Sequence, residues 1–163
     1  MTSHLKLFSL ILFLTVSQSI YAQISFGDEA MDIALPSIKG DTISLSSLRG
    51  KVVLLDFWAS WCPPCRAANK RLTRLYPKYK DKGFEIYGVS LDDNTRNWTK
   101  AIAKDKISWL QVIDAGGWEA PTAINWRINA IPTSYLIDKQ GRLVAMDPDG
   151  KELEKMLDEL LKN

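Results

Sequence analysis

The two cysteines of this chain lie three positions apart, in the segment Trp61-Cys62-Pro63-Pro64-Cys65. They are the only cysteines in the sequence, and they follow closely on the apolar run 52–58. A change from strand to helix is expected here, because apolar residues recur at helical spacing from Pro64 onward. Two thiols at this spacing at a helix start can form and break one disulfide bond. The pattern therefore predicts thiol–disulfide exchange.

Two other uses of a cysteine pair fit the sequence less well. A structural disulfide between Cys62 and Cys65 would close a loop of only about four residues, which removes little entropy from the unfolded chain. A structural zinc site needs four ligands, usually cysteine and histidine. The only histidine, His4, lies in an N-terminal segment that is expected to be removed, and a blue-copper site fails for the same reason. We therefore predict no metal site and no bound cofactor.

The expected helix start assigns different roles to the two thiols. Unpaired N–H groups and the helix dipole at a helix N-terminus favour an anion, and the thiolate is the nucleophilic form of cysteine. We expect Cys62 to be more exposed than Cys65 and to attack the partner disulfide. Cys65 would then attack the mixed disulfide and release the product. Pro63 and Pro64 have no N–H group, so neither can donate a hydrogen bond to the Cys62 sulfur.

A strand–helix–strand unit is predicted around the cysteine pair. The apolar runs 52–58 and 84–90 have the length of buried strands, and the helical pattern that begins at Pro64 lies between them. Pro77 should kink or end this helix near Tyr76, because proline removes a helical hydrogen bond and restricts the residue before it.

Further elements precede and follow this unit. Before it, the sequence predicts a small hairpin over 27–45. After it, the sequence predicts a helix over about 96–104 capped by Asn94 or Thr95, a strand over 109–113, and a hairpin of strands 134–138 and 142–146 around Gly141. The chain should end in an amphipathic helix, whose apolar residues are Leu153, Met156, Leu157, Leu160 and Leu161. This order predicts an α/β domain with a mixed central sheet flanked by helices.

The N-terminus has the pattern of a secretory signal. Lys6 precedes an apolar stretch at 7–16, and small or polar residues follow as far as Ala22. The apolar stretch has about ten residues, fewer than the ~20 that a membrane span needs. We expect residues 1–22 to be a signal peptide, with an uncleaved N-terminal anchor as the alternative, and residues 23–163 to form one domain. The predicted location is periplasmic or otherwise extracytoplasmic, where disulfides persist.

The charge pattern gives no case for binding nucleic acid or an anionic membrane. Lys and Arg number 21 against 19 Asp and Glu, so the formal net charge is +2. No block of like charge stands out along the sequence.

The segment from Phe57 to Cys65, Phe-Trp-Ala-Ser-Trp-Cys-Pro-Pro-Cys, closely resembles the active-site signature of the thioredoxin superfamily. The segment Ile131-Pro132-Thr133 resembles the loop that carries the cis-proline of that superfamily. Pro132 lies 67 residues after Cys65, a longer interval than in a minimal thioredoxin. With the front hairpin and the exported N-terminus, the chain is similar over residues 27–163 to the TlpA/ResA-like extracytoplasmic thiol–disulfide oxidoreductases. The resemblance implies a thioredoxin-like fold with an N-terminal β-hairpin and a βα insertion.

The resemblance also implies a role for Asp56, six positions before Cys62. It matches the buried aspartate of thioredoxins and would move a proton to or from Cys65, a role that suits a buried carboxylate with a raised pKa. The alternative is a strand-end aspartate paired with a lysine. Many TlpA/ResA-like proteins carry a glutamate three residues after the second cysteine and often a proline two residues later. Ala68 and Lys70 stand at these positions here.

Substrate contacts are implied for the residues around the cysteine pair. Trp61, Pro63 and Pro64 would contact the substrate at the rim of the site, with a core position as the alternative for Trp61. A cis-proline at Pro132 would leave the Ile131 backbone free to pair with an extended substrate strand. The alternative for Pro132 is an ordinary loop proline.

The function that fits these features is an extracytoplasmic protein-disulfide reductase or oxidoreductase. Protein disulfides or thiols would be its substrates and a membrane thiol protein its electron donor; apocytochrome c is a substrate suggested by family analogy alone. A monomer is expected. A peroxiredoxin-like thiol peroxidase is the alternative, but Ala59 and a proline-free run over 52–61 do not fit the usual peroxidatic motif. An intact cysteine pair counts against a redox-inert binding module.

Overall fold

Strand β3 (Val52–Trp58) lies at the centre of the sheet, and all seven of its residues are buried. The structure is a computed structural model that describes residues 25–162. The expected signal peptide, residues 1–22, lies outside the described residues. β3 pairs in parallel with β4 (Phe84–Ser90) and antiparallel with β6 (Thr133–Ile137).

Two further strands complete the sheet. β5 (Leu110–Ile113) pairs in parallel with β4, and β7 (Leu143–Met146) pairs antiparallel with β6. The order across the sheet is β5-β4-β3-β6-β7. This confirms the predicted mixed sheet and the predicted hairpin around Gly141, which has a φ of 82°.

The predicted N-terminal hairpin is also present. β1 (Ala34–Pro36) and β2 (Thr42–Ser44) pair antiparallel, and a short 3-10 helix, η1 (Leu45–Leu48), follows them. Ser37 forms an isolated bridge with Val112, which places the hairpin beside β5.

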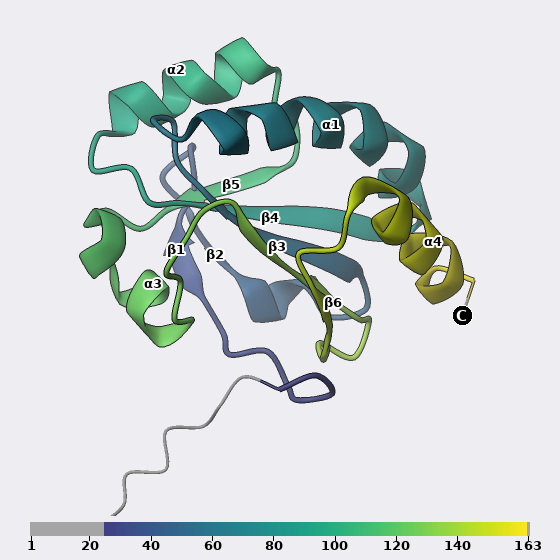
Figure 1. Cartoon of the computed structure of the whole chain (residues 1–163). Coiled ribbons are helices and arrows are strands. Elements are labelled where there is room, and N and C mark those ends of the chain that lie inside the picture. The colour runs from purple at the N-terminus through teal and green to yellow at the C-terminus, as the bar shows by residue number, and fades with distance from the viewer. Residues whose placement is uncertain (1–24, 163) are drawn as a thin grey trace, which may run out of the picture.

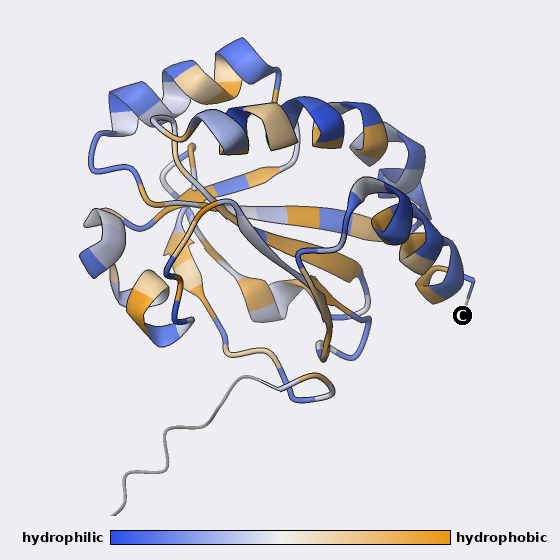
Figure 2. Ribbon diagram, viewed as in Figure 1, coloured by the Kyte–Doolittle hydropathy of each residue, from blue (hydrophilic) through white to orange (hydrophobic). Residues whose placement is uncertain are grey.

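Helices cover both faces of the sheet (Figure 1). α1 (Pro63–Tyr79), α2 (Thr95–Asp105) and α4 (Gly150–Leu160) lie on one face. The short helix α3 (Pro121–Asn125) and the β1–β2 hairpin lie on the other. Figure 2 shows that the helices turn apolar residues toward the sheet and polar residues away from it.

The side chains of β3 alternate between these two layers, as a strand requires. One set packs with the N-terminal hairpin and the α3 region: Val53, Leu55 and Phe57. The other set packs toward α1, α2 and α4: Val52, Leu54 and Trp58. Asp56 belongs by this alternation to the second set, and it is the only polar residue of β3. A carboxylate therefore lies on the apolar face that receives α1.

The prediction that Pro77 would end the first helix near Tyr76 is wrong, whereas the alternative expectation of a kink at Pro77 stays a prediction. α1 continues through Pro77 to Tyr79. Pro77 lies in the last turn of α1 and removes the one helical hydrogen bond that its own N–H would make. The rings of Tyr76 and Tyr79 both pack against Phe84, with centroids 6.2 and 6.4 Å away. Burial of these aromatic rings offsets the cost of about 3 kcal/mol that a proline inside a helix carries.

The segment between β4 and β6 holds α2, β5, a 3-10 helix η3 (Gly117–Glu119) and α3. The long interval between Cys65 and Pro132 led us to expect an extra strand and helix, and this segment contains them. Asn94 caps α2 by accepting hydrogen bonds from the N–H groups of Arg96 and Asn97. The sequence did not identify α3. Within residues 25–162, no helix combines the length and apolar character that a membrane crossing requires.

Gly88 of β4 lies opposite Gln111 of β5, so a substitution at Gly88 tests how closely these strands must approach. A Cβ atom at Gly88 would lie 2.2 Å from Nε2 of Gln111, whose Oε1 accepts a hydrogen bond of 2.9 Å from Trp58 Nε1. Gly88→Ala should therefore lower the free energy of unfolding by about 1–3 kcal/mol, because the Gln111 side chain must move. Urea unfolding measures this.

The matched control is Gly150→Ala, at the first residue of α4, where a Cβ would meet nothing within 4 Å. This change should be neutral or stabilising by up to about 1 kcal/mol. Equal effects of the two substitutions would contradict the close approach.

Candidate active site

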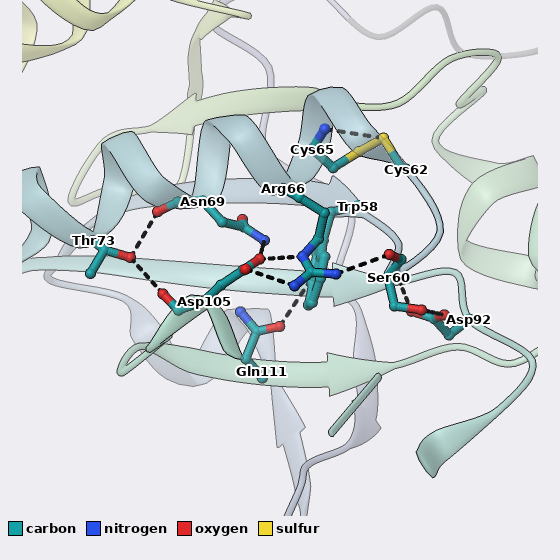
Figure 3. A network of polar contacts seen from close by, with 10 residues as sticks. All are labelled: Trp58, Ser60, Cys62, Cys65, Arg66, Asn69, Thr73, Asp92, Asp105 and Gln111. Carbon is teal, nitrogen blue, oxygen red and sulfur yellow. Dashed lines mark hydrogen bonds and ion pairs between the residues drawn. A yellow bond between two sulfur atoms is a disulfide. The ribbon is translucent and has the colours of Figure 1, made fainter. Parts of the chain in front are cut away.

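Cys62 and Cys65 form a disulfide at the start of α1 (Figure 3). Cys62 is the N-cap residue, and its sulfur accepts a hydrogen bond of 3.2 Å from the N–H of Cys65. Pro63 and Pro64 occupy the first two helical positions and have no N–H to offer. The first N–H of the helix is therefore directed at the Cys62 sulfur, where it can stabilise a thiolate.

Both cysteines are buried in this disulfide form. Cys62 is 4% exposed and Cys65 is 1% exposed. The expected order of exposure is present, but the difference is small, because the Cys62 side chain packs with Trp58 and Ile131 as well as with Cys65.

The loop at Ile131 reaches the cysteine pair from the far half of the chain. The Ile131–Pro132 peptide bond is cis, as the resemblance implied. The carbonyl oxygen of Ile131 lies 3.6 Å from the Cys62 sulfur. A disulfide sulfur carries no hydrogen, so this is a contact in the oxidised state, whereas a Cys62 thiol could donate to the same oxygen. The Ile131 backbone makes no hydrogen bond to other backbone groups in residues 25–162.

An exposed aromatic pair lies beside the cysteines. Trp61 is 51% exposed, so it is a rim residue and not part of the core. Its ring packs edge-on against Trp118, with centroids 6.2 Å apart, and Trp118 is 45% exposed. Nothing in the local sequence of Trp118 indicates that η3 places it beside Trp61.

Ser60, two positions before Cys62, is fixed by three of its polar groups (Figure 3). Its N–H and hydroxyl donate to the carboxylate of Asp92, which is 1% exposed. Its carbonyl accepts a hydrogen bond of 3.2 Å from Arg66, which is also paired with Asp105 through two hydrogen bonds. This network joins the segment before Cys62 to the end of β4 and to α2.

Asp56 is nearly inaccessible and has no paired cation. It is 4% exposed, and no lysine or arginine in the described part of the chain forms an ion pair with it. The alternative of a lysine-paired aspartate is therefore wrong. Burial, followed by the charge of Asp147, raises the pKa of Asp56 to about 7. Such a carboxyl can both take up and release a proton near neutral pH.

A pocket of about 890 Å³ between α1 and α4 connects Asp56 with the surface. Ala68, Pro132, Ser134 and Asp147 also line it. Ala68 replaces the glutamate of many TlpA/ResA-like proteins, so it adds no carboxylate to this pocket. Asp147 accepts a hydrogen bond of 2.6 Å from the N–H of Ser134, which pairs with Asp56 across β6 and β3. The sequence analysis missed Asp147.

The comparisons with known proteins agree with this geometry. A family model described as AhpC/TSA family matches residues 26–146, which is more than half of the chain. The chain belongs to the AhpC/TSA family. The thiol-disulfide oxidoreductase ResA of Bacillus thuringiensis subsp. konkukian is 32% identical over 140 residues, which cover 86% of this chain and 79% of that protein.

Solved structures of two Bacteroides proteins resemble this AhpC/TSA family member over most of its length. The thioredoxin domain of a thiol-disulfide oxidoreductase from Bacteroides vulgatus has a TM-score of 0.78 and 34% identity, covering 85% of this chain and 99% of that chain. A thiol-disulfide oxidoreductase from Bacteroides fragilis has a TM-score of 0.76 and 40% identity, covering 82% and 99%.

The predicted fold and activity class are thereby confirmed. Within the AhpC/TSA family, this chain is a thiol–disulfide oxidoreductase with a thioredoxin-like fold and a Cys62–Cys65 redox pair. The relatives described above are named thiol–disulfide oxidoreductases and not peroxidases.

The raised pKa of Asp56 makes the stability of the protein depend on pH. The folded state keeps the Asp56 proton up to a pKa of about 7, whereas an unfolded aspartate loses it near pH ~3.9. The parent should therefore lose stability as pH rises through this window. Asp56→Asn removes that loss, so its free energy of unfolding relative to the parent should rise by up to ~4 kcal/mol between about pH 4 and pH 8.

Urea unfolding of the oxidised proteins at several pH values measures this difference. Asp81→Asn, at an exposed residue with no side-chain hydrogen bond in the described part, controls for the loss of one surface carboxylate. A constant difference between Asp56→Asn and the parent across this range would show that Asp56 titrates normally.

Proposed function

We propose that this protein is an exported protein-disulfide reductase that uses Cys62 as nucleophile and Cys65 as resolving thiol. The observation that carries the proposal is the position of Cys62. Its sulfur caps α1, accepts the Cys65 N–H, and lies 3.6 Å from a carbonyl of the loop at Ile131. A thiolate at this point is stabilised by the helix and lies beside the Ile131 backbone, which makes no hydrogen bond to other main-chain groups within residues 25–162.

The reaction proceeds in two exchanges. The Cys62 thiolate attacks one sulfur of the substrate disulfide, whose S–S bond breaks and releases a substrate thiolate. The Cys65 thiolate then attacks the Cys62 sulfur of the mixed disulfide and expels the second substrate thiolate. Two electrons pass from the protein dithiol to the substrate, and the protein is left with the Cys62–Cys65 disulfide.

Asp56 serves the second exchange by accepting the proton of Cys65. A pKa of about 7 allows it to be unprotonated in part of the molecules at neutral pH. The pocket between α1 and α4 then provides a path by which the proton reaches solvent. In the opposite direction, the same carboxyl would return a proton to the Cys65 thiolate.

The substrate binds as an extended strand across the Ile131 loop. Among the described residues, the Ile131 backbone has no hydrogen-bond partner in the main chain, and Pro132 beside it is exposed. Strand addition to free backbone groups supplies affinity without demanding one sequence. Trp61, together with exposed Pro63 and Pro64, provides the apolar rim on the other side of the Cys62 sulfur.

The proposed cellular setting is supported by the signal-like pattern of the N-terminal sequence. A removed signal over residues 1–22 would deliver residues 23–163 to the periplasm or another extracytoplasmic compartment. A membrane thiol protein would return electrons to the pair, and the domain would act as a monomer. Apocytochrome c cysteines are one substrate within this proposal.

Substitution of the cysteines one at a time tests the assignment. Cys62→Ser should reduce turnover of a protein disulfide such as that of insulin to the uncatalysed rate, because the attacking thiolate is gone. Cys65→Ser should also stop turnover but accumulate a mixed disulfide between Cys62 and the substrate, visible by mass spectrometry without reductant.

Peroxide consumption by the same variants separates this function from that of a peroxidase. We expect no peroxide turnover above that of the free thiol. Faster alkylation of Cys65 than of Cys62 in the reduced protein, or mixed disulfides trapped on Cys65, would reverse the assignment.

A further inference from the structure

A groove of cationic side chains begins beside the attacking sulfur and follows the seam between α1 and α2. Two adjoining pockets of about 520 and 210 Å³ form it. Both are lined by Ser60, Arg66 and Lys104. The larger pocket also includes Trp61 and Pro63, the neighbours of Cys62. We call this the cationic groove.

The cations of the groove form two pairs with helical i,i+4 spacing. Arg66 and Lys70 lie on α1, and Lys100 and Lys104 lie on α2. Residues four apart are neighbours on a helix surface, and like charges at that spacing destabilise the helix. Lys104 lies in the last turn of α2, where the helix dipole favours a cation, but Lys100 lies one turn earlier. Arg66 stabilises the fold through Asp105 and the Ser60 carbonyl. Lys70 and Lys100, in contrast, form no ion pair among residues 25–162, and their position along the groove points to binding.

The groove contains too few anions to neutralise these cations. Of residues 25–162, only Asp105 is an acidic residue that lines either pocket, and both of its oxygens receive hydrogen bonds from Arg66 (Figure 3). Asp92 is buried behind Ser60 and is hydrogen-bonded there. Burial raises the pKa of Asp105, but the hydrogen bonds from Arg66 and Asn69, followed by the charges of Arg66 and Lys70, lower it below its usual value. Lys70 forms no ion pair with Asp105.

Three exposed lysines therefore line the groove without a paired carboxylate among residues 25–162: Lys70, Lys100 and Lys104. The whole chain carries a formal net charge of only +2. The cationic groove is thus a local excess of positive charge and not a reflection of the overall composition.

We propose that the cationic groove binds acidic side chains that flank the cysteine of a polypeptide substrate. The proposal rests on the function proposed above and adds a substrate preference to it. From Asn97 to Lys104 the lining residues of α2 extend over about 10 Å at 1.5 Å per residue. That length suits several residues of a chain. Because Trp61 and Pro63 lie at one end of the groove, a chain whose disulfide reaches Cys62 places its neighbouring residues along these lysines.

The test uses three peptide disulfides that differ only in charge. Each is a symmetric dimer of a blocked peptide whose single cysteine is flanked on both sides by two Glu, two Gln or two Lys residues. The reduced protein is mixed with each dimer at low ionic strength, the reaction is quenched with acid, and remaining thiols are counted by alkylation and mass spectrometry. The second-order rate constant for oxidation of the protein is the readout.

Lys100→Glu/Lys104→Glu is compared with a matched control, Lys151→Glu/Lys155→Glu. The control pair has the same i,i+4 spacing on α4, is exposed, and lines neither pocket of the groove. Both variants change the net charge equally. The same three peptides are used throughout, so differences in their intrinsic reactivity cancel in the ratio of the Glu rate to the Gln rate.

We expect the ratio of the Glu rate to the Gln rate to fall about tenfold in Lys100→Glu/Lys104→Glu relative to the parent and to stay near the parent value in the control. In the parent, the same ratio should fall at high salt, because salt screens the charges. The Lys peptide should show the opposite trend. Equal ratios in the two variants would overturn the proposal that the groove binds acidic side chains. Exchange with the Gln peptide would still proceed, so the proposed function would stand. Failure of the parent to react with any of the three peptides would instead overturn the proposed function.

Discussion

Burial of strand β3 on both faces is the constraint on which the site depends. A strand in this position must be apolar, and β3 is apolar at every residue except Asp56. Its last residue, Trp58, is buried in the core, and the chain then turns into α1. Cys62 consequently caps a helix whose direction is fixed by the sheet, and Asp56 stays on the same face as that helix.

Two carboxylates near the cysteine pair behave differently because their surroundings differ. Asp92 accepts hydrogen bonds from Ser60 and Ser90, which hold the segment before Cys62 in place. Asp56 has no such donors in the part of the chain that the structure describes, and burial raises its pKa to about 7. The first carboxylate positions the site, whereas the second is suited to moving a proton. Hydrogen bonding therefore determines which of the two aspartates positions the site and which can move a proton, a difference that residue type alone does not reveal.

The sequence predicted those features that depend on local pattern. The alternation and length of apolar runs located the strands of the sheet, and the cysteine spacing next to a helical pattern located the redox pair. Pro77 was misjudged because the packing of Tyr76 and Tyr79 is a tertiary effect. The contact between Ile131 and Cys62 could be expected only from the family resemblance, because no local pattern links two segments so far apart: Pro132 lies 67 positions after Cys65.

Other parts of the site could not be predicted from one sequence. The ring of Trp118 contacts that of Trp61 only because two segments far apart in the sequence fold together. For the same reason the charge of Asp147 raises the pKa of Asp56. Each stands in a segment with ordinary turn composition. Likewise, the i,i+4 pairs that line the cationic groove are visible in the sequence, but their common seam requires the packing of α1 beside α2.

An equilibrium redox titration of the Cys62–Cys65 pair tests the central claim most directly. The protein is equilibrated in thiol–disulfide buffers over a range of potentials, and its free thiols are counted by alkylation and mass spectrometry. A protein-disulfide reductase should show one two-electron transition, with both thiols appearing together, at a potential near that of thioredoxin, about −270 mV. A midpoint near −120 mV would indicate an oxidant, and a pair that stays oxidised below about −300 mV would be a structural disulfide. Either result would contradict the account.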